Sequence, residues 1–146
     1  MKARMIVTAL AVLAAGTGLA FADAALKDNR EAAMKSVGGA MGALVKIAKG
    51  EAAYDAAIVK TSLTTIAGVG KTFPALFPAA DAVEDKAASP KIWENMDDFK
   101  ARSAKLTADA EGLLAMLPAD QAAVGASLKT LGDNCAGCHE LYRLKE

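Results

Sequence analysis

The chain has 146 residues and a formal net charge of zero, with 17 basic and 17 acidic side chains. This balance, without a cluster of Lys and Arg, argues against nucleic acid as a partner, because phosphate backbones are bound by basic surfaces. The length suits a single domain with one core. The only histidine and the only two cysteines lie close together near the C-terminus, at Cys135, Cys138 and His139.

Residues 1–22 have the pattern of a secretory signal peptide. A short basic head precedes an apolar run, and Ala20-Phe21-Ala22 places small residues at the two positions that a signal peptidase reads. We expect cleavage before Asp23, which leaves residues 23–146 as one exported domain. The alternative is a membrane anchor. Glycines interrupt the run and no basic segment follows it, so no anchor is expected after cleavage.

The spacing of the apolar residues predicts an all-α protein. They recur at intervals of three and four, without the sustained alternation of strands. We expect helices at about residues 24–49, 51–72, 90–117 and 120–142. Gly50 closes the first, Ser89-Pro90 starts the third, and Pro118 and Asp120 open the fourth. The first two helices are joined by a short connection, as are the last two. The predicted architecture is therefore an antiparallel up-down-up-down four-helix bundle.

Each predicted helix has one apolar stripe that is expected to face the core. The stripes comprise Val37, Met41, Leu44 and Ala48; Val59, Leu63, Ile66 and Phe73; Trp93, Met96, Phe99, Ser103, Leu106, Ala110, Leu113 and Leu117; and Val124, Leu128, Leu131, Cys135, Cys138 and Tyr142. The connection over residues 74–89 is long for such a bundle and is expected to cover something. Gly38 and Gly42 share one face of the first helix, which indicates a close approach of either a second helix or a second subunit.

Cys135-Ala136-Gly137-Cys138-His139 is a C-x-x-C-H motif, the attachment signal for a c-type haem. Residues three apart lie on one face of a helix, near enough for two thiols to reach the two vinyl groups on one porphyrin edge. Each thiol then adds to a vinyl group and forms a thioether. His139 follows directly and places an imidazole nitrogen under the iron as axial ligand. We expect one haem c per chain.

Three other uses of these residues fit the sequence less well. A C-x-x-C oxidoreductase has its motif at the start of a helix in a βαβ setting, which is not predicted here. A zinc site lacks a fourth ligand. A structural disulfide leaves His139 without a role. Export also supports haem attachment, because in bacteria the attachment apparatus works in the periplasm.

With no second histidine, a sixth iron ligand from the protein is expected to be a methionine. His139 lies near one end of the predicted bundle, at the level where the first and third helices begin, so Met34 and Met96 are the candidates. Met34 is either an iron ligand or core filler. One turn earlier on the same stripe, Arg30 is either a partner for a haem propionate or a side chain that reaches outward to solvent.

Arg143 follows His139 by four residues on the same helix face. Beside the imidazole, its positive charge would disfavour the oxidised iron. The alternative is an exposed cation that complements the dipole at the C-terminal end of the helix.

These residues resemble the class II c-type cytochromes, the family of cytochrome c prime, which are among the known four-helix bundles. The resemblance covers nearly all of residues 23–146. It rests on "REAAMK", "AKGEAAYDAA", "FPALFP", "SPKIWENMDDF" and, most specifically, the C-terminal "CAGCHELYR". It implies covalent haem on Cys135 and Cys138, with axial His139, a propionate contact at Arg30 and Arg143 beside the histidine.

The resemblance also bears on what the protein does. At the position of Met34, a bulky apolar side chain leaves the iron five-coordinate in high-spin members, whereas a methionine binds it in low-spin relatives, although some high-spin members also carry methionine. Glu31 stands where relatives often have glutamine, so a haem contact there is not carried over. Homodimers are common in the family.

We therefore expect a periplasmic monohaem cytochrome that exchanges electrons with redox partner proteins. The alternative is a high-spin haem protein that binds NO or CO. Enzymatic turnover is not expected, because the sequence shows no convincing general base or proton relay.

Overall fold

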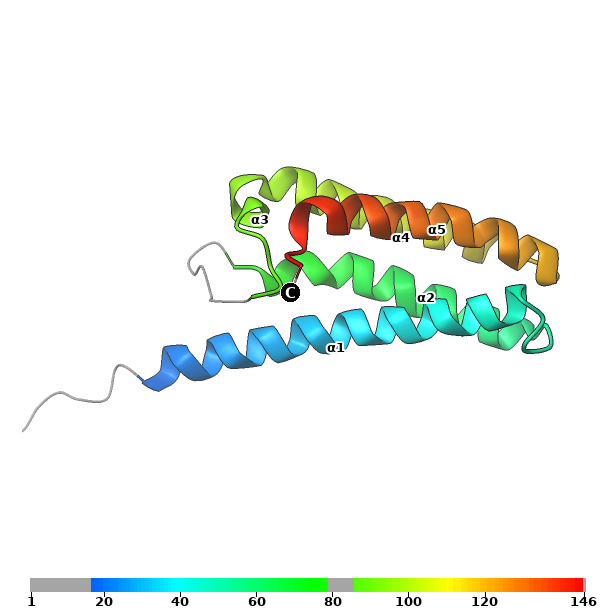
Figure 1. Ribbon diagram of the computed structural model, residues 1–146, viewed down its shortest axis with the longest axis horizontal. Coiled ribbons are helices and arrows are strands. Elements are labelled where there is room, and N and C mark those ends of the chain that lie inside the picture. Colours follow the sequence, from blue (N-terminus) through cyan, green and yellow to red (C-terminus); the bar gives the residue numbers. More distant parts are fainter. Residues whose placement is uncertain (1–16, 79–85, 146) are drawn as a thin grey trace, which may run out of the picture.

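The computed structural model describes residues 17–78 and 86–145, and within them the chain is helical. In order, the elements are α1 (Thr17–Ala48), α2 (Ala56–Thr72), the 3-10 helix η1 (Phe73–Leu76), α3 (Lys91–Glu94), α4 (Met96–Ala115) and α5 (Gln121–Tyr142). The four long helices lie side by side, and α1 packs on α2, α2 on α4, α4 on α5 and α5 on α1 (Figure 1). The predicted four-helix bundle is confirmed. The predicted signal peptide lies mostly outside the described residues.

The turn between α1 and α2 differs from the prediction. Gly50 adopts a φ of +73°, as expected of a residue that closes a helix. However, α2 begins at Ala56 rather than at residue 51, because Asp55 takes an extended backbone and its carboxylate accepts the N–H groups of Ala57 and Ile58. Such a side-chain cap fixes the first turn of the helix more strongly than the apolar spacing does.

The predicted third helix is interrupted. It is divided into α3 and α4 at Asn95, whose φ of −132° and ψ of 49° are not helical. The hydroxyl of Ser89 accepts the N–H of Lys91, so the predicted start is confirmed. The sequence does not predict this break, because the apolar spacing of Trp93, Met96 and Phe99 continues across it.

Two apolar clusters fill the bundle. The main core joins all four long helices and is built from Val37, Leu44, Ile47, Val59, Leu63, Ile66, Ala67, Ala110, Val124 and Leu131. A second cluster, here called the aromatic cluster, comprises Phe77, Ile92, Phe99 and Tyr142, with Phe73, Leu76, Ala88, Trp93, Met96 and Cys138 packed against it. The aromatic cluster joins the segment after α2, both parts of the interrupted helix and the last turn of α5. It therefore marks the end of the bundle at which the C-x-x-C-H motif lies.

The fourth predicted helix is confirmed as α5, which begins after Asp120. The carboxylate of Asp120 caps the helix by accepting the N–H of Ala123 at 2.8 Å. No helix within the described part of the chain is long and apolar enough to cross a bilayer.

Among the described glycines, the closest helix approach occurs at Gly70 and not at the glycines singled out from the sequence. A Cβ at Gly38 or Gly42 would meet no described atom within 4 Å, so a helix of the same chain does not explain them. A Cβ at Gly70 would lie 2.6 Å from Thr107 Oγ1 and 3.2 Å from Ser103 O. The hydroxyl of Ser103 also donates to Gly70 O at 2.6 Å. The absence of a side chain at Gly70 thus sets the spacing between α2 and α4.

We expect Gly70→Ala to lower the free energy of unfolding by about 1–3 kcal/mol, because the new methyl group pushes against backbone atoms of α4. Gly68→Ala is the matched control: a Cβ there meets nothing within 4 Å, so better helix propensity should raise stability by up to about 1 kcal/mol. Denaturant unfolding followed by circular dichroism measures both. Equal effects of the two substitutions would contradict the close approach at Gly70.

Candidate functional site

The C-x-x-C-H motif lies in the last two turns of α5. Both thiols are half-buried, and burial raises the pKa values of Cys135 and Cys138, so both groups are protonated near neutral pH. Partial burial, followed by the charge of Arg143, lowers the pKa of His139. The imidazole is consequently neutral near pH 7, the form in which histidine binds metals.

Helix α4 holds the motif from one side through polar contacts. The guanidinium of Arg102 donates from Nη1 to Gly137 O at 3.0 Å, between the two cysteines, and from Nε to Asp98 Oδ2 at 2.7 Å. The hydroxyl of Tyr142 donates to the same carboxylate oxygen at 2.6 Å. The hydrogen bond from Arg102, then that from Tyr142, lowers the pKa of Asp98. Asp98 therefore contacts the α5 end at Tyr142, and its partner Arg102 contacts it at Gly137.

The segment before α3 holds the same end of α5 through the backbone. Ser89 N–H donates to Tyr142 O at 3.0 Å, and Leu144 N–H donates to Ala87 O at 2.9 Å. These bonds form an antiparallel bridge between Ala88 and Arg143. Tyr142 itself is only 5% exposed and stacks edge-on against Phe99, with ring centroids 5.2 Å apart. The residues after the motif are thus anchored on two sides.

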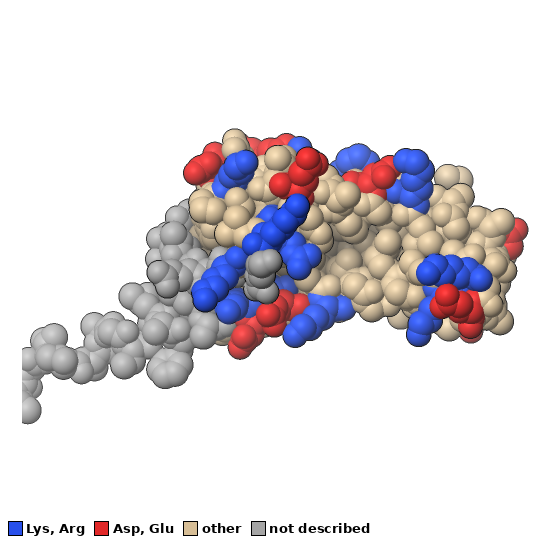
Figure 2. All heavy atoms as spheres, in the orientation of Figure 1, with Lys and Arg blue, Asp and Glu red and all other residues tan. Residues whose placement is uncertain are grey.

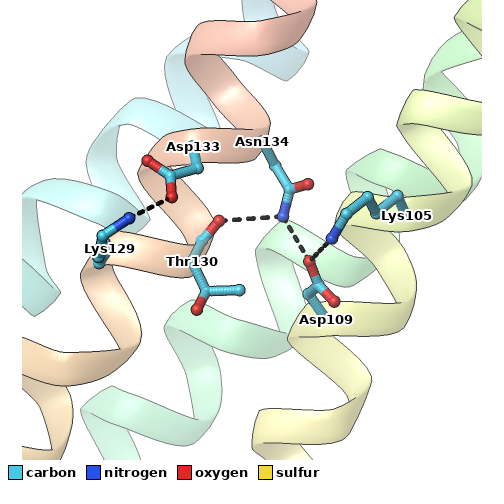
Figure 3. A network of polar contacts seen from close by, with 6 residues as sticks. All are labelled: Lys105, Asp109, Lys129, Thr130, Asp133 and Asn134. Carbon is cyan, nitrogen blue, oxygen red and sulfur yellow. Dashed lines mark hydrogen bonds and ion pairs between the residues drawn. The ribbon is translucent and has the colours of Figure 1, made fainter.

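A second polar network connects α4 and α5 just before the motif (Figure 3). Asp109 accepts from Lys105 Nζ and from Asn134 Nδ2, both at 2.6 Å, while Asn134 also donates to Thr130 O at 3.1 Å. The hydrogen bond from Lys105, then that from Asn134, lowers the pKa of Asp109. A shallow surface pocket of about 340 Å³ lies beside these residues, lined by Arg102, Lys105, Thr130, Asp133, Asn134 and Gly137. The network fixes the register of α5 against α4 one turn ahead of Cys138.

Arg30 is buried in α1 with an exposed fraction of 4%, so it does not reach outward to solvent. Its Nε and Nη2 atoms donate to Leu76 O at 2.9 and 2.7 Å. Its guanidinium carbon lies 4.2 Å from the centroid of the Phe77 ring, a distance at which a cation is attracted to the ring face. Arg30 thus joins α1 to η1 and to the aromatic cluster. The sequence predicts the place of Arg30 at this end of the bundle but not its contacts with Leu76 O and Phe77.

The methionines occupy different environments. Met41 packs against the main core, Met96 packs against the aromatic cluster, and Met116 is 81% exposed. Met34 is half-buried, and among the described residues both apolar clusters form without it. Met34 lies one turn from Arg30 at the motif end of α1, and it belongs to neither apolar cluster of the described residues.

Two charged residues singled out from the sequence lie at the surface. Arg143 is exposed and caps α5, with its N–H donating to His139 O at 3.1 Å. Glu31 forms an exposed ion pair with Lys35, with Nζ and Oε2 3.1 Å apart. Asp98 and Arg102 were not singled out from the sequence, and Tyr142 was predicted only as part of the apolar stripe of its helix. The spacing of Asp98 and Arg102, four residues apart on one helix, was the available signal.

A sequence model of the family described as Cytochrome C' matches residues 25–143. The chain belongs to this family. A relative called cytochrome c-556 from Agrobacterium tumefaciens (strain apple 185) is 59% identical over 86% of this chain and 99% of its own length. The solved structure of cytochrome c' from Rhodopseudomonas palustris is 38% identical over 83% of this chain and 97% of its own, with a TM-score of 0.76.

A third comparison is a nitric oxide complex of a mutant of cytochrome c prime from Alcaligenes xylosoxidans. It is 26% identical over 85% of this chain and 97% of its own, with a TM-score of 0.73. As a member of the Cytochrome C' family, the protein described here is a c-type cytochrome with covalently bound haem c. Its sequence contains only Cys135 and Cys138 to attach that group.

The residues present fit haem c. The two thiols are three positions apart on the one helix whose end is anchored by Asp98, Arg102 and the segment before α3. A neutral imidazole follows directly at His139. When bound, haem supplies an iron centre that gains and loses one electron.

The hydrogen bonds to Asp98 predict a pH-dependent contribution to stability. The folded-state pKa of Asp98 is depressed below the value of about 3.9 expected in the unfolded chain. Its stabilising effect is therefore present above about pH 4 and is lost as the pH falls through the folded-state pKa. We expect Asp98→Asn to destabilise the protein more at pH 7 than at pH 3, as measured by urea unfolding at both pH values. Asp97→Asn, an exposed neighbour, is the control, and a pH-independent loss in Asp98→Asn would contradict this contribution.

Proposed function

We propose that the protein is an exported, periplasmic monohaem cytochrome that transfers electrons. The observation that carries the proposal is the α5 end, where two half-buried thiols and a neutral imidazole lie on a helix turn anchored to α4. An anchored turn keeps its geometry when the charge of the bound group changes, which favours electron exchange over substrate chemistry. Enzymatic turnover is not part of the proposal.

Each residue then has a defined role. Cys135 and Cys138 provide the thioether sulfurs, and His139 provides the axial nitrogen. Arg30 is the proposed partner of a haem propionate, because it is a buried cation at the motif end of α1 and a guanidinium matches the geometry of a carboxylate. Arg143 flanks the imidazole, consistent with the effect of its charge on the pKa of His139.

Met34 is the proposed sixth ligand of the iron. Met41 and Met96 are engaged in the two apolar clusters, and Met116 is at the surface. Met34 shares the motif end of α1 with Arg30 and has a flexible thioether side chain. A methionine ligand is typical of cytochromes that carry electrons rather than bind gases.

The second candidate function is the binding of NO or CO at an iron without a sixth protein ligand. The observation that favours it is the nitric oxide complex of the relative from Alcaligenes xylosoxidans. This function requires that Met34 lies beside the iron without binding it. The two candidate functions thus differ in whether the sulfur of Met34 binds the iron.

Optical and EPR spectra of the purified ferric protein distinguish the two candidates. We expect a low-spin signal with a methionine-to-iron charge-transfer band, and we expect Met34→Leu to convert the iron to the high-spin form. Met96→Leu is the matched control and should stay low-spin. A high-spin spectrum of the unaltered protein would rule out ligation by Met34 and favour gas binding.

Export and partners complete the proposal. The family match begins at residue 25, just after the proposed cleavage point before Asp23.

Figure 2 shows basic side chains gathered around the C-terminal end of the chain, and Arg143 and Lys145 there are exposed. A redox partner with an acidic surface is therefore proposed to dock near the motif. A Cβ added at Gly38 or Gly42 would meet no described atom of a neighbouring element within 4 Å, so this face of α1 is open, and a second subunit is proposed to pack there as in a homodimer.

A further inference from the structure

We propose that Asp98 and Arg102 are positioning residues of the turn that binds the haem. We also propose that their charges shift the reduction potential of the haem in opposite directions. The inference rests on the proposed attachment of haem at Cys135 and Cys138. It concerns two side chains of α4 that lie outside the C-x-x-C-H motif.

The positioning role follows from the geometry of the Arg102 fork. Nε binds Asp98 at 2.7 Å and Nη1 binds Gly137 O at 3.0 Å, so one planar group joins α4 to the carbonyl between the two cysteines. Asp98 in turn accepts from Tyr142, three residues after His139. The turn that carries Cys138 and His139 is therefore held at both ends by one ion pair. Lysine cannot reproduce the fork, because its ammonium group is a single point of charge on a flexible stem.

The electrostatic role follows from the signs of the two charges. The guanidinium of Arg102 donates to Gly137 O at 3.0 Å, next to Cys138, and the carboxylate of Asp98 accepts from Tyr142 at 2.6 Å, so both charges lie beside the turn that attaches the haem. Reduction removes one unit of positive charge from the group attached there. Arg102 therefore favours the reduced state and Asp98 favours the oxidised state.

A purely structural role predicts a different pattern. Loss of either side chain would loosen the turn and admit water. Water stabilises the more highly charged oxidised state, so both substitutions would then move the potential downward. The sign of the shift in Asp98→Asn consequently separates the two roles.

The test is a spectroelectrochemical titration of the haem-loaded protein and its variants at low ionic strength. At a fixed applied potential, we expect Arg102→Gln to lower the ratio of reduced to oxidised protein by roughly three- to tenfold, and Asp98→Asn to raise it by a similar factor. Tenfold corresponds to about 59 mV for a one-electron couple. Arg102→Lys, which keeps the charge but loses the fork, should lower the ratio less than Arg102→Gln does. Added salt should shrink both shifts, because both side chains are partly exposed.

Two control variants remove a charge elsewhere on α4. Lys100→Gln removes an exposed cation two residues from Arg102, on the face that lines a surface groove with α2. Glu111→Gln removes an exposed carboxylate roughly 20 Å along the helix from Asp98, at 1.5 Å per residue. Both should change the ratio by less than about twofold, because both side chains are exposed and solvent screens their charge.

Hydrogen exchange measured by mass spectrometry on the same samples tests the positioning role. We expect faster exchange at the amides of residues 138–143 in Arg102→Lys and Arg102→Gln, with unchanged exchange in α2. Unchanged exchange at residues 138–143 would overturn the positioning role, and shifts of Asp98→Asn and Arg102→Gln in the same direction would overturn the electrostatic one. Absence of covalent haem from the unaltered protein would instead overturn the proposed function.

Discussion

The hydrogen bonds that meet at the Asp98 carboxylate are the constraint on which the motif end of the bundle depends. Arg102 and Tyr142 both donate to one oxygen, and through them α4 holds the turn of Gly137 and the last turn of α5. The backbone bridge between Ala88 and Arg143 holds the same end of α5 from the segment before α3.

The two apolar clusters have different roles in the fold. The main core joins the four long helices with aliphatic side chains and does not involve the motif. The aromatic cluster lies at the motif end, where Cys138 packs against it and the Arg30 cation lies over Phe77. A cofactor attached at this end would lie near the aromatic cluster, whereas the main core joins the long helices without the motif.

The sequence predicted the bundle and the attachment motif because both depend on local spacing. Apolar residues at intervals of three and four predicted the helices, and the C-x-x-C-H motif predicts the site. The start of α2 and the break at Asn95 were not predicted, because they depend on one cap and one backbone conformation. The contacts of Arg102 with Gly137 and of Arg30 with Leu76 O join residues far apart in the chain, and no local pattern encodes them. The close approach predicted at Gly38 and Gly42 rested on their spacing alone. The close approach observed at Gly70 depends on how α2 packs against α4.

The central claim, covalent haem held by this one turn of α5, is tested most directly by peptide mass spectrometry. Trypsin cleaves after Lys129 and Arg143 and releases residues 130–143, which contain both cysteines and the only histidine. We predict that this peptide carries the mass of one haem and that neither cysteine reacts with an alkylating reagent. A peptide of unmodified mass that takes up two alkyl groups would contradict the claim.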